Sequence, residues 1–206
     1  MIAIVDYGMG NLRSVQKGLE KVGAESAIID SAESIGSADK LVLPGVGGFG
    51  QAIDHLRTAG LVEPILRFIE TGRPFLGICL GYQLLFDRSS EEGDHTGLGV
   101  FAGDIVRFDF SQMPEAADLK VPHMGWNQLW WDRECPLLEG LESGTYFYFV
   151  HSYYARPTDP HVNRALCDYG IRFAAMTWRD HVFATQFHPE KSQRDGLRVL
   201  ANFAAL

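Results

Sequence analysis

The sequence predicts an α/β fold with a mixed, mostly parallel central sheet flanked by helices and an added antiparallel β layer in the second half. In the first ninety residues, short apolar runs alternate with stretches whose apolar residues recur at helical spacing. From about residue 99, aromatic and β-branched runs follow one another closely, as in antiparallel strands. Hydrophobic residues make up 46% of the 206-residue chain, so we expect a substantial core and one domain over residues 1–206.

The first half predicts parallel strands, because helices separate them. Residues 2–5 are an apolar run suited to a strand buried on both faces. Apolar side chains recur at helical spacing in residues 12–22 until Gly23, a suitable C-terminal cap. We predict further strands at 27–29, 40–43 and 75–78 and helices at 61–69 and 80–86. Ligands bind beyond the carboxyl ends of such strands, where both the glycine-rich segment 44–48 and Cys79 fall.

The second half predicts strands and hairpins followed by one helix. The predicted strands cover residues 100–110, 128–131, 145–150, 172–178 and 181–185. Arg179 and Asp180 suit a tight turn between the last two of these strands. Residues 196–206 predict a closing helix, with Leu197, Leu200 and Phe203 on one side.

Charge and composition exclude several classes of function. The net charge of −8 argues against nucleic-acid binding, which needs a basic surface. No apolar run approaches the roughly 20 residues that span a bilayer, and the chain opens on a strand-like run without a signal peptide. Three scattered cysteines do not suggest a disulfide framework, so we expect a cytoplasmic protein in which Cys135 and Cys167 are structural.

Two segments far apart in the chain carry groups for nucleophilic catalysis. Residues 77–81 have the G-x-nucleophile-x-G form of a sharp strand-to-helix turn, with Cys79 where hydrolases often carry serine. His188 and Glu190 supply an imidazole and a carboxylate. A thiol becomes a strong nucleophile when a base takes its proton and a carboxylate orients that base. We therefore predict acyl transfer through a Cys79 thioester; a buried thiol, a core histidine and a surface carboxylate are the structural alternatives.

The glycine-rich segment 44–48 is a candidate for oxyanion stabilisation, with a plain turn as the alternative. Glycine lets a backbone approach a ligand closely, so the amides of Val46 and Gly47 can donate to a developing negative charge. The amide of Leu80, next to the nucleophile, is the natural second donor.

Nucleotide and metal sites are not supported by the motifs. Residues 6–11 partly match a dinucleotide loop, but Arg13 stands where the third glycine is required. Four histidines form no metal-binding spacing with one another or with the cysteines, which excludes a zinc site: His151, His161, His181 and His188.

Six segments resemble the class I, triad-type glutamine amidotransferases, and the resemblance runs nearly the whole length. They are residues 6–11 (DYGMGN), 44–47 (PGVG), 77–83 (GICLGYQ), 122–127 (PHMGWN), 149–154 (FVHSYY) and 186–192 (QFHPEKS). The cysteine and His-Pro-Glu segments are typical of the whole family. The opening, PHMGWN and HSYY segments resemble one branch, the glutaminase subunits of imidazole glycerol phosphate synthases. Tyr82, where the family more often has methionine, is a mild departure.

The resemblance implies a flavodoxin-like fold, a glutaminase activity that needs no cofactor, and a set of residues that hold glutamine. The Cys79 thiolate would attack the side-chain amide, and His188 would pass a proton to ammonia and then activate water. The positions that match glutamine-binding residues are Gln83, Glu91 and the backbone at Gly47, Ser152 and Tyr153. For Glu91, a solvated loop charge is the alternative interpretation.

The resemblance also implies a partner, a (β/α)₈ cyclase on a separate chain, which the length of this chain favours. It would receive ammonia and make imidazole glycerol phosphate and an aminoimidazole carboxamide nucleotide in histidine biosynthesis. The oxyanion segment would switch its amides into place when the partner docks. Positions matching the subunit contact are Asn11, Trp126 and Lys191, although composition alone favours a core aromatic at Trp126.

Three other functions remain open on the sequence alone. Another triad glutaminase, for pyridoxal phosphate or aminobenzoate-type synthesis, would share the triad, but the PHMGWN segment argues against it. A non-enzymatic binding module could keep the fold, although the intact Cys79, His188 and Glu190 argue for an enzyme. A thiol protease or esterase would share the acyl chemistry and leave the glutamine-site residues unexplained.

Overall fold

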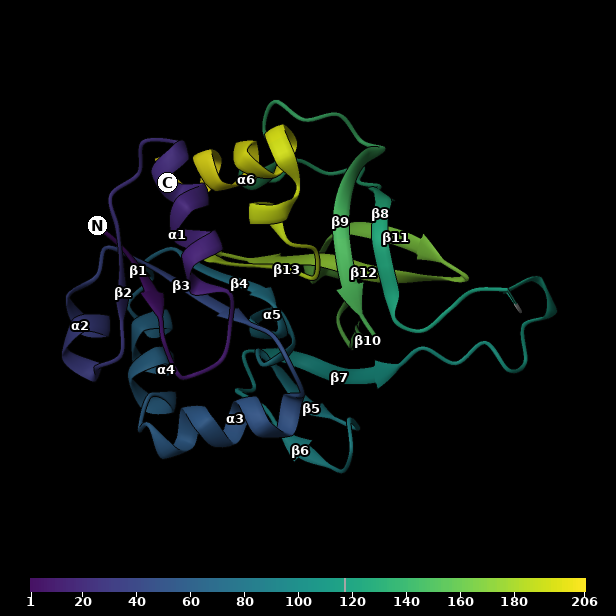
Figure 1. Ribbon diagram of the computed structural model, residues 1–206, viewed down its shortest axis with the longest axis horizontal. Helices are drawn as coiled ribbons and strands as arrows, with labels where there is room; N and C mark the ends of the chain where they lie inside the picture. Colours follow the sequence, from purple (N-terminus) through teal and green to yellow (C-terminus); the bar gives the residue numbers. More distant parts are fainter. Residues whose placement is uncertain (117) are drawn as a thin grey trace.

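The computed structural model describes residues 1–116 and 118–206, and within them the main element is a sheet of eleven strands (Figure 1). The strands of this sheet are β1 Ile2–Val5, β2 Ser26–Ile29, β3 Lys40–Gly45, β4 Phe75–Cys79, β5 Phe86–Ser89, β6 His95–Thr96, β7 Phe101–Arg107, β10 Tyr153–Pro157, β11 Asn163–Tyr169, β12 Ile171–Arg179 and β13 Val182–Thr185. A separate two-stranded ribbon pairs β8 (His123–Leu129) with β9 (Thr145–His151).

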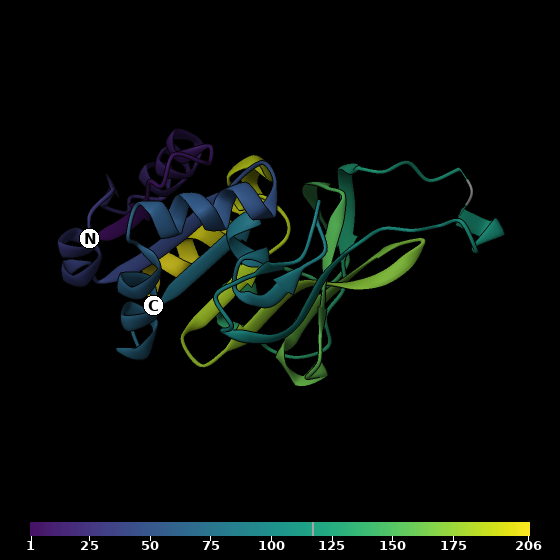
Figure 2. The same ribbon diagram turned by 90° about the horizontal axis from the view of Figure 1, so that it is seen from below.

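The helices lie on both faces of this sheet. They are α1 Leu12–Lys21, α2 Ala32–Ser37, α3 Phe49–Thr58, α4 Val62–Glu70, α5 Leu80–Gln83 and α6 Gln193–Ala205. Figure 1 shows α1 and α6 above the sheet and α3 and α4 below it; Figure 2 looks from below, with α3 nearest and yellow α6 beyond. No helix in the described part of the chain is long and apolar enough to cross a membrane.

The strand order confirms the predicted fold class. Strands β2, β1, β3, β4 and β13 are parallel neighbours in that order, and β12, β10 and β7 continue the same sheet in antiparallel fashion. The antiparallel part is therefore mostly an extension of the central sheet, and the β8–β9 ribbon alone forms a separate layer over it. The predicted hairpin is confirmed: β12 and β13 pair around Asp180, which has φ 54°.

Alternating side chains of the central strands supply two hydrophobic cores. Ala3 and Val5 of β1 pack with α2, α3 and α4, whereas Ile2 and Ile4 pack with α1, α6 and the β8–β9 ribbon. Both cores are built largely from residues with no exposed surface. A strand buried on both faces needs apolar residues at every position, which is what residues 2–5 supply.

One predicted helix differs from the structure, and two observed helices, α2 and α3, were not predicted. The predicted helix at 80–86 ends after one turn, because Leu84 and Leu85 accept hydrogen bonds from Leu98, Val100 and Phe101 and the chain turns into β5. A run of adjacent buried apolar residues has no helical period, so its length alone was misleading. The unpredicted α3 does have that period, in Phe49, Ala52, Ile53 and Leu56.

Candidate active site

Three parallel strands bring the separate catalytic motifs together. In β3 and β4, Gly45 is the register partner of Cys79, so Val46 and Gly47 continue beside the nucleophile. On the other side of β4, Thr185 of β13 pairs with Ile78, and the chain then continues to His188. The carboxyl ends of adjacent parallel strands meet at one edge, which explains why distant segments converge.

The turn at Cys79 is strained, and the flanking glycines make room for it. Cys79 has φ 55°, a left-handed conformation that is unusual for a residue with a side chain. A Cβ atom at position 81 would lie 1.8 Å from the Leu43 carbonyl oxygen, and one at 77 would lie 2.9 Å from the Gly81 oxygen. The backbone thus holds Cys79 at the start of α5 with 7% of its surface exposed.

His188 and Glu190 form a buried pair next to Cys79. The Nδ1 atom of His188 lies 2.7 Å from Oε1 of Glu190, and their side chains are 3% and 2% exposed. Burial alone would lower the pKa of His188, but the interactions of the ring with Cys79 and with Glu190 outweigh it and raise that pKa to about 10. Nε2 of His188 has no hydrogen-bond partner among the described residues, so this nitrogen is free to take part in proton transfer.

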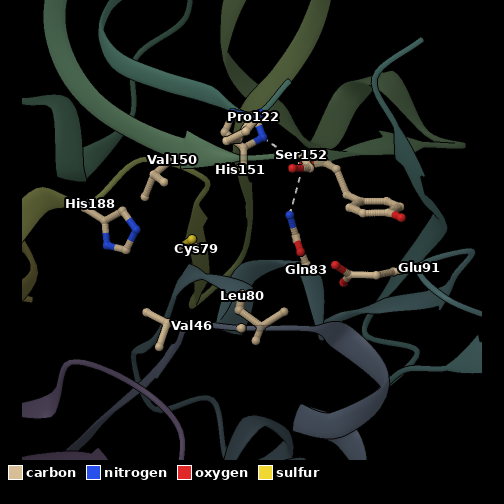
Figure 3. A pocket seen from close by; sticks show the side chains of 12 residues that line it. Val46, Cys79, Leu80, Gln83, Glu91, Pro122, Val150, His151, Ser152 and His188 are labelled. Atoms are coloured by element: carbon tan, nitrogen blue, oxygen red, sulfur yellow. Dashed lines mark hydrogen bonds between the residues drawn. The ribbon is translucent and has the colours of Figure 1, made fainter. Parts of the chain in front are cut away.

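A pocket of about 290 Å³ opens above the Cys79 sulfur (Figure 3). Its volume is close to the lower end of the roughly 300–1,000 Å³ found for small-molecule sites, as suits a ligand the size of one amino acid. All predicted oxyanion and substrate residues line it: Val46, Gly47, Leu80, Gln83, Glu91, Ser152 and Tyr153. Gly47 has φ +99°, a conformation that favours glycine.

Glu91 belongs to this pocket, so the alternative of a solvated loop charge is wrong. Its Oε2 atom accepts a hydrogen bond of 2.7 Å from the Phe49 N–H at the start of α3. Burial raises the pKa of Glu91, and this hydrogen bond opposes the rise. Tyr82 lies outside the pocket: it is fully buried and its hydroxyl donates to the Ala174 carbonyl at 3.0 Å.

Trp126 is exposed, so the interpretation as a core aromatic is wrong. It retains 46% of its accessible surface and meets Tyr148 edge-to-face with ring centroids 6.2 Å apart. Lys191 lies near the same tyrosine, with its Nζ atom 5.9 Å from the Tyr148 ring centroid. Asn11 is also exposed and follows Gly10, which packs against Gly45.

Sequence reasoning missed a buried histidine pair behind the pocket. Nδ1 of His123 lies 3.0 Å from Nε2 of His151, and Nδ1 of His151 lies 2.7 Å from the Tyr153 carbonyl oxygen. That oxygen can only accept, so Nδ1 of His151 carries the proton, Nε2 accepts, and His123 donates. Burial lowers the pKa of His123 to about 4 and that of His151 to about 3, so both rings are neutral.

This pair should make folding stability sensitive to acid. The pKa of His151 is lower in the folded protein than its usual 6.5, so below about pH 6.5 the unfolded chain binds a proton that the folded chain refuses. The contribution to stability is complete above pH 6.5 and is lost progressively toward about pH 3. We expect His151→Gln to reduce the slope of unfolding free energy against pH by up to about 1.4 kcal/mol per pH unit between pH 6 and 4.

Urea denaturation at a series of pH values measures that slope. The matched control is His161→Gln, which removes an exposed histidine and should leave the slope as in the unmodified chain. Equal slopes in His151→Gln and the unmodified chain would contradict the prediction.

Gln186 is a second residue that sequence reasoning left without a role. It is fully buried, and its Nε2 atom lies 3.8 Å from the Cys79 sulfur. Its presence in the same motif as His188 was the available signal.

Comparison with known proteins assigns the family. Residues 3–205 match the model of the family described as Glutamine amidotransferase class-I. The chain belongs to this family.

Similar proteins in this amidotransferase family cover the chain almost completely. The Imidazole glycerol phosphate synthase subunit HisH of Syntrophotalea carbinolica is 58% identical over 203 residues, which are 98% of each protein. The same subunit of Geobacter sulfurreducens is 53% identical over 205 residues, covering 100% of this chain and 98% of that protein. A crystal structure of a glutamine amidotransferase superposes over the full length of both chains with a TM-score of 0.75 at 20% identity, which supports the fold.

Membership of the amidotransferase family identifies the chain as an enzyme of glutamine chemistry. The earlier alternatives of a non-enzymatic module and of a thiol protease or esterase are therefore set aside.

Proposed function

We propose that this chain is the glutaminase subunit of an imidazole glycerol phosphate synthase. It hydrolyses glutamine to glutamate and ammonia at Cys79 and passes ammonia to a (β/α)₈ cyclase on a separate chain. The cyclase makes imidazole glycerol phosphate and an aminoimidazole carboxamide ribonucleotide for histidine biosynthesis. The observation that carries the proposal is a complete cysteine–histidine–glutamate site in a chain more than half identical to proteins with that name. A reduced thiol suits the cytoplasm.

Glutamine hydrolysis proceeds in two steps, formation of a γ-glutamyl thioester and its hydrolysis. The Cys79 thiolate attacks the side-chain carbonyl carbon of glutamine, the carbon–nitrogen bond breaks, and protonated His188 gives its proton to the departing ammonia. Neutral His188 then takes a proton from water, and the hydroxide attacks the γ-glutamyl thioester. Glutamate leaves and the thiolate returns, with Glu190 holding the imidazole in place throughout.

Backbone amides at Val46, Gly47 and Leu80 would stabilise the oxyanion of each tetrahedral intermediate. Tyr7 holds this segment in place, because its buried hydroxyl donates to the Pro44 carbonyl at 3.0 Å. Leu80 has the position next to the nucleophile that such turns use for an oxyanion donor. We propose that partner docking switches the amides of Val46 and Gly47 toward the substrate.

Gln83 and Glu91 would recognise the α-ammonium group of glutamine. Nε2 of Gln83 donates to the Tyr153 carbonyl at 3.0 Å and to Oε1 of Gln186 at 2.9 Å, so its two hydrogens are used. Its remaining oxygen can only accept, and Figure 3 shows it turned toward the Glu91 carboxylate. Two acceptors that line the same pocket suit a cation.

Replacing Glu91 by glutamine should therefore weaken glutamine binding. A charge-assisted hydrogen bond contributes about 1.5–3 kcal/mol, so we expect KM to rise about 10- to 100-fold with kcat within about twofold. Glu92→Gln is the matched control, since Glu92 is exposed and next in the chain. Steady-state glutamate release measures both constants, and a large loss of kcat at unchanged KM would contradict this role.

The partner would dock on the rim formed by Asn11, Trp126 and Lys191. Trp126 and Lys191 both lie against the Tyr148 ring, which is 6.5 Å from the ring of the pocket residue His188. Met124 and Val46 add exposed apolar surface, with 62% and 39% of their surface accessible. Apolar side chains on a polar rim are typical of a protein interface.

The decisive experiment measures glutamate release by this chain, alone and with a cyclase subunit that holds its nucleotide ligand, beside a Cys79→Ala control. We expect strong stimulation by the cyclase and none in the control. Glutaminase activity that responds only to a different synthase would keep the thiol chemistry and overturn the pathway.

A further inference from the structure

Gln186 places a buried amide beside the nucleophile. Gln186 directly follows β13 and is fully buried. Its Nε2 atom lies 3.8 Å from the sulfur of Cys79. Its Oε1 atom accepts a hydrogen bond of 2.9 Å from Nε2 of Gln83, which is itself 5% exposed. These contacts hold the Gln186 side chain in one orientation and turn its NH₂ group toward the Cys79 sulfur.

The direction of the Gln186 amide is fixed by a chain of forced donors and acceptors. The Tyr153 carbonyl oxygen can only accept, so the group of Gln83 that faces it must be the NH₂ group. The same NH₂ group then faces Gln186, which must answer with its oxygen. The NH₂ group of Gln186 is left to face Cys79. A flipped amide would set an oxygen against the sulfur and two NH₂ groups against each other.

We propose that Gln186 is a further catalytic residue, whose amide N–H donates to the Cys79 thiolate, and that Gln83 positions this amide. The proposal rests on Cys79 being the nucleophile of the proposed function. It gives Gln83 two tasks, with its NH₂ group holding Gln186 and its oxygen facing the substrate.

A donor at this place has a clear physical purpose. Cys79 is 7% exposed, so water supplies few hydrogen bonds to its thiolate. The ionisable groups around it are His188 after β13, with Glu190 behind it, and Tyr7 after β1. His188 also has to transfer its proton during the reaction. The N–H of a neutral amide is not acidic, so it gives the thiolate a second hydrogen-bond donor that takes no part in proton transfer.

The test follows alkylation of Cys79 by iodoacetamide against pH in the full chain, with mass spectrometry of the Cys79 peptide. Only the thiolate reacts, so the midpoint of the rate profile reports how well the site stabilises it. We expect Gln186→Met, which keeps length without a donor, to raise the midpoint by about one pH unit. Gln83→Met should raise it less, because the Gln186 amide can then rotate.

The matched control is Thr185→Val, which removes a buried hydroxyl one residue away that donates to the Phe187 carbonyl at 3.1 Å. Its midpoint should stay that of the unmodified chain. An unchanged midpoint in folded Gln186→Met overturns the proposal. If that variant does not fold, Gln83→Met decides in the same way: a raised midpoint supports the proposal, and an unchanged one overturns it.

This outcome is separable from the proposed function. Glutamate release by the unmodified chain with its cyclase tests the function without reference to Gln186. If the unmodified enzyme is active but neither Gln186→Met nor Gln83→Met changes the alkylation midpoint, the role of Gln186 is refuted and the proposed function stands.

Discussion

Glutamate release should fall by about 10⁴-fold or more when Cys79 is replaced by alanine. Without the thiol, no γ-glutamyl thioester can form. The oxyanion amides and His188 remain in place, but the site has no nucleophile. Cys79→Ser should be nearly as inactive, since a hydroxyl is far harder to deprotonate than a thiol. A coupled assay of glutamate, run at saturating glutamine with the cyclase present, measures the loss.

The other two cysteines provide matched controls. Burial raises the pKa of Cys135 to about 11 and that of Cys167 to about 12, so both thiols are protonated at neutral pH. Cys135→Ala and Cys167→Ala should each keep turnover within a few-fold. Loss of activity in one of these folded variants, with activity retained in Cys79→Ala, would move the nucleophile elsewhere.

The fold was predictable where the sequence pattern depends on local geometry. Residues 2–5 and 75–78 are apolar at every position because both faces of a central strand are covered, and this signal is direct. The brevity of α5 was not predictable, because it depends on hydrogen bonds that Leu84 and Leu85 accept from residues 98–101. Nor does the sequence of β13 reveal that it pairs in parallel with β4, which is decided by a distant part of the chain.

The site was predictable to the extent that its residues occur in compact motifs. Cys79 stands out because glycines flank it in a strand-to-helix turn. His188 and Glu190 stand out because a base and an orienting carboxylate lie two residues apart. Gln186 stood in a recognised motif without a role, since its function depends on Gln83, which lies 103 residues away in sequence. The His123–His151 pair likewise joins two strands of the ribbon, and no spacing along the chain indicates it.

Replacing Glu190 by glutamine should lower kcat by about 10²- to 10⁴-fold and narrow the alkaline side of the pH profile. Cys79 and Glu190 together raise the pKa of His188 to about 10 against the effect of burial. Without the carboxylate, burial counts for more and the pKa of His188 falls. The imidazolium that protonates ammonia is then lost at a lower pH, so the alkaline limb of kcat against pH should move down. The neutral amide also holds the imidazole less firmly.

Rates across a pH series separate these two effects. A loss of kcat with an unmoved alkaline limb would mean that Glu190 orients the ring without stabilising its charge. Glu142→Gln, an exposed change of the same chemistry, should alter neither quantity. Because Oε2 of Glu190 has no partner among the described residues, its only described hydrogen bond is the one that Oε1 makes with His188. A buried carboxylate with a single hydrogen-bond partner is costly to fold, so its stabilisation of charged His188 is the gain that offsets that cost.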